Sequence, residues 1–249
     1  DAGLNNNWAN TDASGINNWW RAGDQYTVRR PDLSNNVWSA TGQKNFNIAI
    51  LDNAARPAMA LNDATGTGGT EFQLHQILFQ NGTSRTLTQG GNAYLHLGGG
   101  SGNAKIEATS PNGSGTYTFN VPVQMAKTTE LNPVGGDLIF NGAITNGGYG
   151  LDVWGGAGKS LTLAGVVSGS GGLNLKSSLS QVGITGHSTY NGDTAVGTGM
   201  LVVNGSISNS AVSVGSGGVV SGAGTIGALT LAGGTVRPDA LFALAHMCR

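Results

Sequence analysis

Short apolar runs alternate with turn-forming residues along most of the chain, most clearly between residues 171 and 238. Each run places apolar side chains at every second position and is closed by Gly, Asn, Ser or Thr; the runs are residues 173–175, 194–196, 201–203, 212–214, 219–220 and 229–231. Runs this short cannot build a hairpin sheet with its own core, but they fit one side of a coil stacked on similar coils. Their spacing of about 6 to 12 residues places about three runs in each coil.

The same alternation begins earlier, near residue 71. Seven further strand candidates follow, at residues 72–79, 93–97, 104–108, 116–123, 137–140, 151–154 and 160–167. Between them lie Asn-Gly and Gly-Gly pairs, which suit backbone turns with positive φ. Composition does not change between about residues 71 and 238. We therefore predict an all-β fold, a right-handed parallel β-helix (β-solenoid) over residues 66–238, with no helix before the tail.

The segment 1–65 has a different character and is predicted to form a separate Trp/Asn-rich module. Four of the five tryptophans occur here, with an arginine next to one pair: Trp8, Trp19, Trp20, Trp38 and Arg21. An open solenoid end exposes unpaired strand edges, which favour aggregation unless they are covered. The module is therefore interpreted first as a cap. The alternative is a platform whose rings contact a sugar or a partner protein, since adjacent side chains on a strand point in opposite directions.

The tail, residues 239–249, contains no glycine and carries Leu241, Leu244 and Ala245 at a helical spacing. Two interpretations stay open for this tail, a short helix or arm that docks on the last coil and a frayed end.

Cys248 is the only cysteine and can form no disulfide within the chain. A β-solenoid of this composition must therefore be stabilised by backbone ladders and stacked apolar side chains.

Five segments of residues 171–238 appear in an order that resembles the autotransporter-associated β-strand repeat. They are GLNLK (172–176), ITGHSTYNGDTAV (184–196), GMLVVNGSIS (199–208), VSVGSGGVVSGAGTIG (212–227) and LAGGTVRP (231–238). The resemblance implies a passenger-type β-solenoid of a secreted or surface-exposed bacterial protein, often with a Trp-rich start. Asp239 stands where the family usually has glycine, and the translocator barrel of true autotransporters is not found in the sequence.

Composition excludes several classes of function. The net charge is −1 and only 10% of the residues are charged, so no basic surface for nucleic acid or anionic membrane is expected. No apolar run is long enough to span a bilayer. The chain opens on DAGLNNN without a basic segment and apolar core, so we expect a mature N-terminus from which a signal peptide has been removed. The expected location is extracellular or on the bacterial cell surface.

No arrangement of reactive side chains stands out in the sequence. His75 and His96 alternate with apolar neighbours and are expected to face solvent, and His187 falls in a predicted surface turn. No histidine or cysteine pattern has metal-ligand spacing, so no metal or other cofactor is predicted. Polysaccharide-degrading β-helix enzymes need clustered carboxylates. Stacking could bring together Glu107, Glu130 and Asp152, but their spacing does not require it.

Four functions are therefore compared. The sequence favours a non-catalytic extracellular or cell-surface protein that is structural or adhesive. One variant of this function is head-to-tail self-assembly into filaments or a matrix, by a contact that does not close. A carbohydrate-binding module that uses the N-terminal tryptophans is the main alternative, and surface carbohydrate or a host or matrix component would then be the partner. A polysaccharide-degrading enzyme is the least favoured, and fold alone does not choose among the four.

Overall fold

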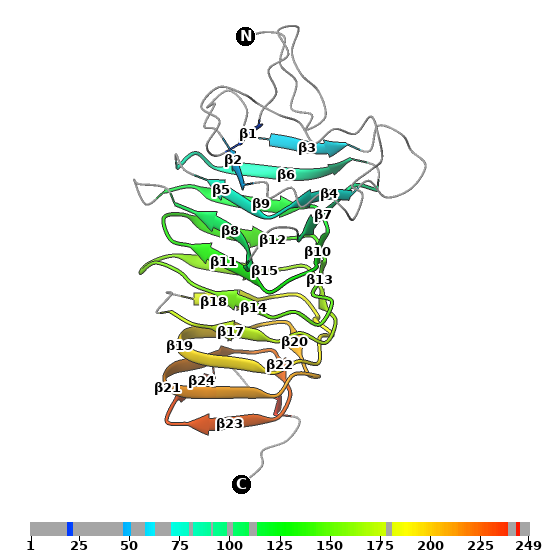
Figure 1. The fold of residues 1–249 in the computed structure, drawn as a ribbon. Coiled ribbons are helices and arrows are strands. Elements are labelled where there is room, and N and C mark those ends of the chain that lie inside the picture. Colours follow the sequence, from blue (N-terminus) through cyan, green and yellow to red (C-terminus); the bar gives the residue numbers. More distant parts are fainter. Residues whose placement is uncertain are drawn as a thin grey trace, which may run out of the picture.

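Strands stacked one above another form an elongated column in this protein (Figure 1). The computed structural model describes residues 19–21, 47–50, 58–62, 71–79, 82–90, 92–98, 102–109, 114–177, 181–238 and 243–244. All regular elements among them are strands, so none of the described segments is a helix that could cross a membrane. Apart from one antiparallel pair at the N-terminal end, the strand pairs among these residues are parallel, which confirms the predicted β-solenoid.

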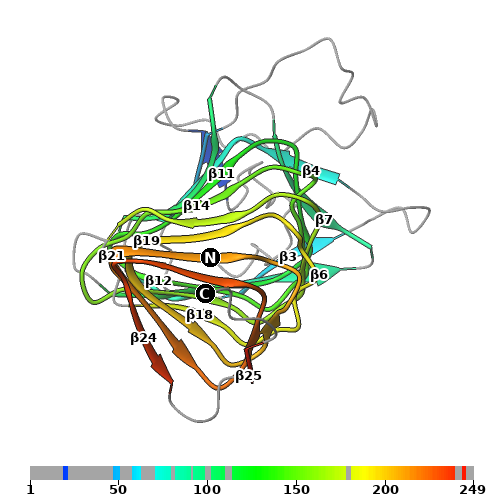
Figure 2. The ribbon, with the colours of Figure 1, turned by 90° about the horizontal axis from the view of Figure 1, so that it is seen from below.

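The strands form three faces, and the chain visits each face once in every coil (Figure 2). Face one consists of parallel neighbours in the order β2 (Asn47–Ile50), β5 (Gln76–Phe79), β8 (Ala104–Ala108), β11 (Thr129–Pro133), β14 (Leu151–Val153), β17 (Leu173–Leu175), the first part of β19 (Thr194–Val203), the first part of β21 (Val212–Gly222) and β23 (Leu229–Ala232). Three runs per coil were predicted from the sequence, and the structure confirms this number.

Face two is built in the same way. Its neighbours are β3 (Ala58–Asn62), β6 (Arg85–Gly90), β9 (Thr116–Asn120), β12 (Asp137–Phe140), β15 (Ser160–Leu163), β18 (Gln181–Ile184), the second parts of β19 and β21, and β24 (Thr235–Pro238). Because β19 and β21 each bend from face one into face two, the two faces are joined into one continuous sheet.

Face three has the shortest strands and is divided into two sheets. The first contains β4 (Glu71–Leu74), β7 (Tyr94–Leu97), β10 (Val123–Met125), β13 (Ile144–Thr145) and β16 (Val167–Ser168). The second contains β20 (Ser206–Ile207), β22 (Thr225–Ile226) and β25 (Ala243–Leu244). The helix considered for the tail is wrong at residues 243–244, because these residues continue the ladder of face three. The rest of the tail, including Cys248, lies outside the described residues.

The interior is a column of apolar side chains, supplied by the inward position of each short strand. In β9, for example, Tyr117 and Phe119 are buried and Thr118 points outward. The Phe119 ring stacks on Phe140 of the next coil, with ring centroids 4.5 Å apart, and meets Phe79 edge-on at 5.9 Å. Like residues thus stack on like residues in the direction of the solenoid axis, as the alternation predicts.

The coils become shorter from the N-terminal end toward the C-terminal end. On face one, a coil at the N-terminal end runs from Ile48 to its register partner Ile77. A coil at the C-terminal end runs only from Val214 to its partner Leu231, so it uses far fewer residues. Most of the difference lies in the corners. Residues 109–115 connect face one to face two after β8, but only Gly197 lies between the two parts of β19 that pair with β21. The sequence did not predict this taper.

One buried asparagine holds a corner between faces three and one. Asn146 is fully buried, and its carboxamide oxygen accepts hydrogen bonds from the backbone N–H groups of Gly148 and Gly171 at 3.1 and 2.9 Å. Its Nδ2 donates to the Gly171 carbonyl at 2.8 Å. A Cβ on Gly171 would lie 1.9 Å from the Tyr149 carbonyl oxygen, so the close approach of two coils here requires glycine.

The N-terminal edge of face one is covered by an antiparallel strand. The backbone of β1 (Trp19–Arg21) pairs with β2, with Trp19 opposite Ile50 and Arg21 opposite Ile48. The parallel stack of face one already includes β2, because β2 pairs with β5. An added strand satisfies backbone groups that would otherwise be open at the edge.

Candidate functional site: a polar strip on face one

The residues singled out from the sequence are only partly placed by the structure. Trp19, Trp20 and Arg21 are brought together as β1, at the N-terminal edge of face one, by their backbone pairing with β2. Trp8 and Trp38 lie outside the described residues. Three of the five residues therefore lie at the N-terminal end of the solenoid, whereas the clustered polar side chains of the described residues lie on the outer side of face one.

Two outward rows of side chains form what we call the polar strip. The first row runs in register through Lys105 of β8, Glu130 of β11, Asp152 of β14 and Asn174 of β17. The second row lies two residues further along each strand, because only alternate residues face outward. The second row contains Glu107, Asn132, Trp154 and Lys176, and Asn103 flanks the first row.

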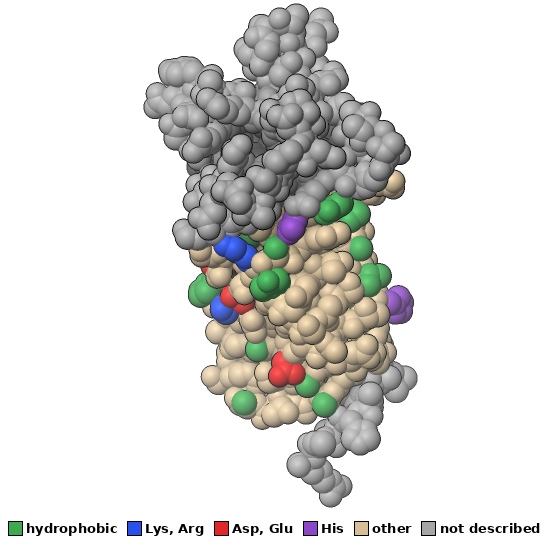
Figure 3. Space-filling model, turned by 45° about the vertical axis from the view of Figure 1, so that its right-hand side comes forward, with side chains coloured by type: hydrophobic (Ala, Val, Ile, Leu, Met, Phe, Trp, Pro, Cys, Tyr) green, Lys and Arg blue, Asp and Glu red, His purple; other side chains and the backbone are tan. Residues whose placement is uncertain are grey.

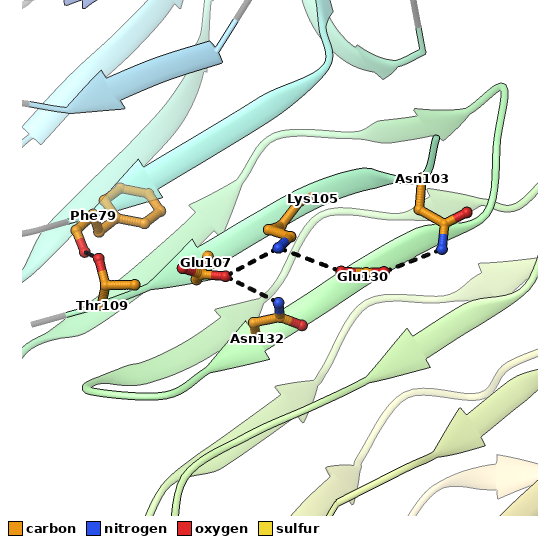
Figure 4. Close-up of polar contacts among 7 residues, drawn as sticks. All are labelled: Phe79, Asn103, Lys105, Glu107, Thr109, Glu130 and Asn132. Atoms are coloured by element: carbon orange, nitrogen blue, oxygen red, sulfur yellow. Dashed lines mark hydrogen bonds and ion pairs between the residues drawn. The ribbon is translucent and has the colours of Figure 1, made fainter. Parts of the chain in front are cut away.

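The half of the strip on β8 and β11 is a network around Lys105 (Figure 4). The Lys105 ammonium lies 3.4 Å from Glu107 Oε2 and 3.5 Å from Glu130 Oε2. Asn103 Nδ2 donates to Glu130 Oε1 and Asn132 Nδ2 donates to Glu107 Oε2, both at 3.1 Å. The charged side chains are 20–29% exposed. Ion pairs of this exposure contribute about 0–1 kcal/mol each, so the network orients these groups more than it stabilises the fold.

The half on β14 and β17 is tighter and ends at an exposed ring. Lys176 Nζ lies 2.6 Å from Asp152 Oδ2, and Asn174 Nδ2 donates to Asp152 Oδ1 at 2.8 Å. The same ammonium lies over the Trp154 ring, 5.7 Å from its centroid. The Asp152 side chain is only 8% exposed, whereas Trp154 is 41% exposed. The lysine that lies over the Trp154 ring is therefore held by a buried carboxylate, although much of the Trp154 surface contacts solvent.

Stacking brings together the three carboxylates considered in the sequence. Glu130 and Asp152 are register partners on neighbouring strands, and Glu107 joins Glu130 through Lys105. Sequence reasoning overlooked the two lysines and Trp154. These residues stand at outward positions that recur once in every described coil of the strip. To recognise this recurrence in the sequence, one must know the register between neighbouring strands, and that register changes with the length of each coil.

The carboxylates of the strip are all paired. All three lie on one face of one sheet, and each contacts a lysine ammonium. Within the described ranges no group of three or more His, Cys, Asp or Glu residues is placed to hold a metal ion.

The histidines are placed apart from this strip. His75 lies at the bend between β4 and β5 and is 6% exposed, so the expectation that it faces solvent is wrong. The alternation that would point it outward is interrupted by the corner. His96 is half-buried on the outward side of β7, and His187 is exposed in a turn that bridges to Ser206.

A second polar cluster lies inside the solenoid, within the repeat-like segment. The Tyr190 hydroxyl and Thr194 Oγ1 are 2.7 Å apart, Thr194 Oγ1 and Ser210 Oγ are 2.8 Å apart, and Ser210 Oγ donates to the Gly192 carbonyl at 2.7 Å. Burial raises the pKa of the Tyr190 phenol, and its hydrogen-bonded neighbours Thr194 and Ser210 oppose the shift. The cluster is buried, so its role is structural.

Tyr190 is expected to make stability fall at alkaline pH. Above its unfolded pKa of about 10 the unfolded chain loses the phenolic proton while the folded chain keeps it, so deprotonation favours unfolding. Tyr190→Phe should be less stable at neutral pH by about 1 kcal/mol, from the lost hydrogen bond, and should lose less stability above pH 10. Urea unfolding at several pH values measures this, and equal alkaline losses in both proteins would contradict it.

Comparison with known proteins identifies no relative of this chain. No family model matches the chain, and no curated protein and no solved structure matches it either. The fold and the polar strip are thus established from this chain's own geometry, which is that of a β-solenoid repeat protein.

Proposed function

We propose that this chain is a non-catalytic structural or adhesive element of an extracellular or bacterial cell-surface protein, of the autotransporter-associated β-strand repeat type. The observation that carries the proposal is the unbroken stack of parallel strands on face one from β2 to β23. Among the described residues neighbouring coils are tied together by backbone hydrogen bonds, so this part of the molecule is a stiff rod. A stiff rod keeps its surface at a fixed distance and orientation from the structure to which it is attached.

The chemistry of the surface supports an exposed location. On the side shown in Figure 3 the described surface is mostly backbone and neutral polar side chains, and charged side chains are few. The described interior is packed with side chains such as Leu95, Ile106 and Leu161, each 0% exposed. The single cysteine of the chain can form no internal disulfide, so the described core is stabilised by its stacked apolar side chains.

The N-terminal edge bears on self-assembly. Head-to-tail docking would have to pair the open C-terminal edge of one chain with the N-terminal edge of the next. The antiparallel strand β1 already occupies that edge on face one. We therefore favour a single rod over a continuous filament. Sedimentation velocity should give one elongated monomer, and a concentration-dependent series of larger species would contradict this.

Two measurements on the same protein test the proposed function. In cells that produce the chain, brief treatment of intact cells with protease should remove it, or it should be recovered from the medium. The purified protein should release no reducing ends from a panel of plant and bacterial polysaccharides. Protection inside intact cells would overturn the location, and turnover of any polysaccharide would overturn the non-catalytic assignment.

A further inference from the structure

We propose that Trp154 anchors a binding site for an uncharged polysaccharide chain that lies along the polar strip of face one. This site rests on the proposed function and deepens its adhesive part, because it names the class of ligand and the surface that binds it. The features that support it are the environment of Trp154, one unsatisfied buried amide, and the charges beside them.

The Trp154 ring is held in place before any ligand arrives. Lys176 lies over the ring, Asp152 holds Lys176 at 2.6 Å, and Asn174 donates to the other Asp152 oxygen at 2.8 Å. A ring that is already oriented loses little conformational entropy on binding, which raises affinity. A large aromatic side chain that is 41% exposed beside a fixed ammonium offers apolar surface that a ligand can bury.

The surroundings of the ring leave room for a flat ligand. The residues that follow Trp154 are Gly155, Gly156, Ala157 and Gly158, none of which has a side chain larger than a methyl group. Val134, at the same corner of the previous coil, is 49% exposed, and the Gly156 backbone packs against its carbonyl. The Lys176 ammonium lies over the indole, and 41% of the Trp154 surface is exposed. An exposed indole can stack on the apolar face of a sugar ring.

One buried polar atom next to the ring lacks a partner. Asn132 is 5% exposed and lies between Glu107 and Trp154 in the second row. Its Nδ2 donates to Glu107, but its Oδ1 accepts no hydrogen bond. A buried acceptor left unsatisfied costs about 1–3 kcal/mol. A ligand hydroxyl that reached this oxygen after a small side-chain movement would recover that cost, and the site therefore favours a hydrogen-bond donor.

The charges of the strip select against an anionic ligand. Two lysines and three carboxylates lie within it, and each lysine is already paired. A sulfated or phosphorylated polymer would meet the carboxylates without a free cation in the strip to balance them, whereas sugar hydroxyls both donate and accept. From β8 to β17 the strip crosses four neighbouring strands, about 14 Å at the usual strand spacing. This length suits several consecutive sugar rings better than a single small molecule.

The test is retention of the purified chain on immobilised neutral polysaccharides, with cellulose, chitin and a soluble β-glucan as probes. Trp154→Ala should weaken binding to at least one of them about tenfold or more, a loss of about 1.4 kcal/mol. Trp154→Phe should retain much of the affinity. Tyr149→Ala is the matched control, because Tyr149 is equally exposed, at 42%, but lies outside the strip. Thermal melting of each variant verifies that the fold is unchanged.

Several results would overturn the proposal. They are no retention on any neutral probe, equal losses in Trp154→Ala and Tyr149→Ala, binding to heparin alone, and a Trp154-dependent contact with a protein instead of a glycan. None of these affects the location or the lack of turnover tested above, so failure of the glycan site is distinguishable from failure of the proposed function.

Discussion

Replacing Phe119 with alanine should lower the free energy of unfolding by about 3–5 kcal/mol. Its ring is fully buried, stacks on Phe140 with an interplanar angle of 8° and meets the edge of Phe79. Phe79 in turn stacks on Tyr117, with centroids 4.1 Å apart. The substitution therefore leaves a cavity in the middle of a continuous aromatic column, where the coils above and below are fixed by backbone hydrogen bonds and cannot collapse into it.

Urea unfolding followed by far-UV circular dichroism measures this loss. The control is Thr118→Ala, one residue earlier on β9, whose side chain faces outward. A surface substitution of this kind changes stability by about 0.5 kcal/mol or less. Equal effects of the two substitutions would show that residues 118 and 119 are not on opposite sides of the strand.

Asn146→Ala is expected to cost about 2–4 kcal/mol, because three hydrogen bonds disappear and each buried group left unsatisfied costs about 1–3 kcal/mol. The groups affected are the N–H of Gly148 and both the N–H and the carbonyl of Gly171. Alanine cannot replace a carboxamide that joins two coils, and glycine at position 171 leaves no nearby side chain to compensate.

Asn209→Ala is the matched control for Asn146→Ala, measured in the same urea experiment. Asn209 is exposed, and its Nδ2 makes a long hydrogen bond of 3.4 Å to the Thr189 carbonyl. We expect a change of about 0.5 kcal/mol or less for this variant. If both asparagines could be replaced at the same small cost, the corner would not depend on the Asn146 carboxamide.

The sequence was sufficient to predict the architecture because a solenoid is specified locally. In 173–175 and 229–231 the alternation of residue types shows which side chains face inward, and the glycines and asparagines between the runs mark corners. Each short run carries this information without reference to its neighbours, so the class of fold and the number of faces follow from the pattern.

The register between coils could not be predicted in the same way. Lys105 lies opposite Glu130, and Glu130 lies opposite Asp152, but the second of these steps uses a shorter stretch of chain than the first. Corner lengths determine the steps, and the corners vary from coil to coil. The polar strip is therefore visible in the sequence only as scattered charges, whereas the dense tryptophans of the segment 1–65 stand out without any knowledge of register.

Corners also explain the one histidine that was misplaced. His75 continues the alternation of its neighbours in sequence, but it stands where face three turns into face one. At this corner the His75 side chain is only 6% exposed, and nothing in LHQ marks the turn. Prediction from alternation is thus dependable within a strand and fails at the residue that joins two faces.

Disulfide formation between engineered cysteines tests the parallel in-register stack most directly. In a Cys248→Ser background, Ala195→Cys with Ser213→Cys should cross-link under mild oxidation, because these residues are register partners on β19 and β21. Ala195→Cys with Thr230→Cys should not, because Thr230 pairs with Ser213 one strand further on, about 10 Å from Ala195 and beyond disulfide reach. Cross-linking of the second pair but not the first would contradict the stacked solenoid.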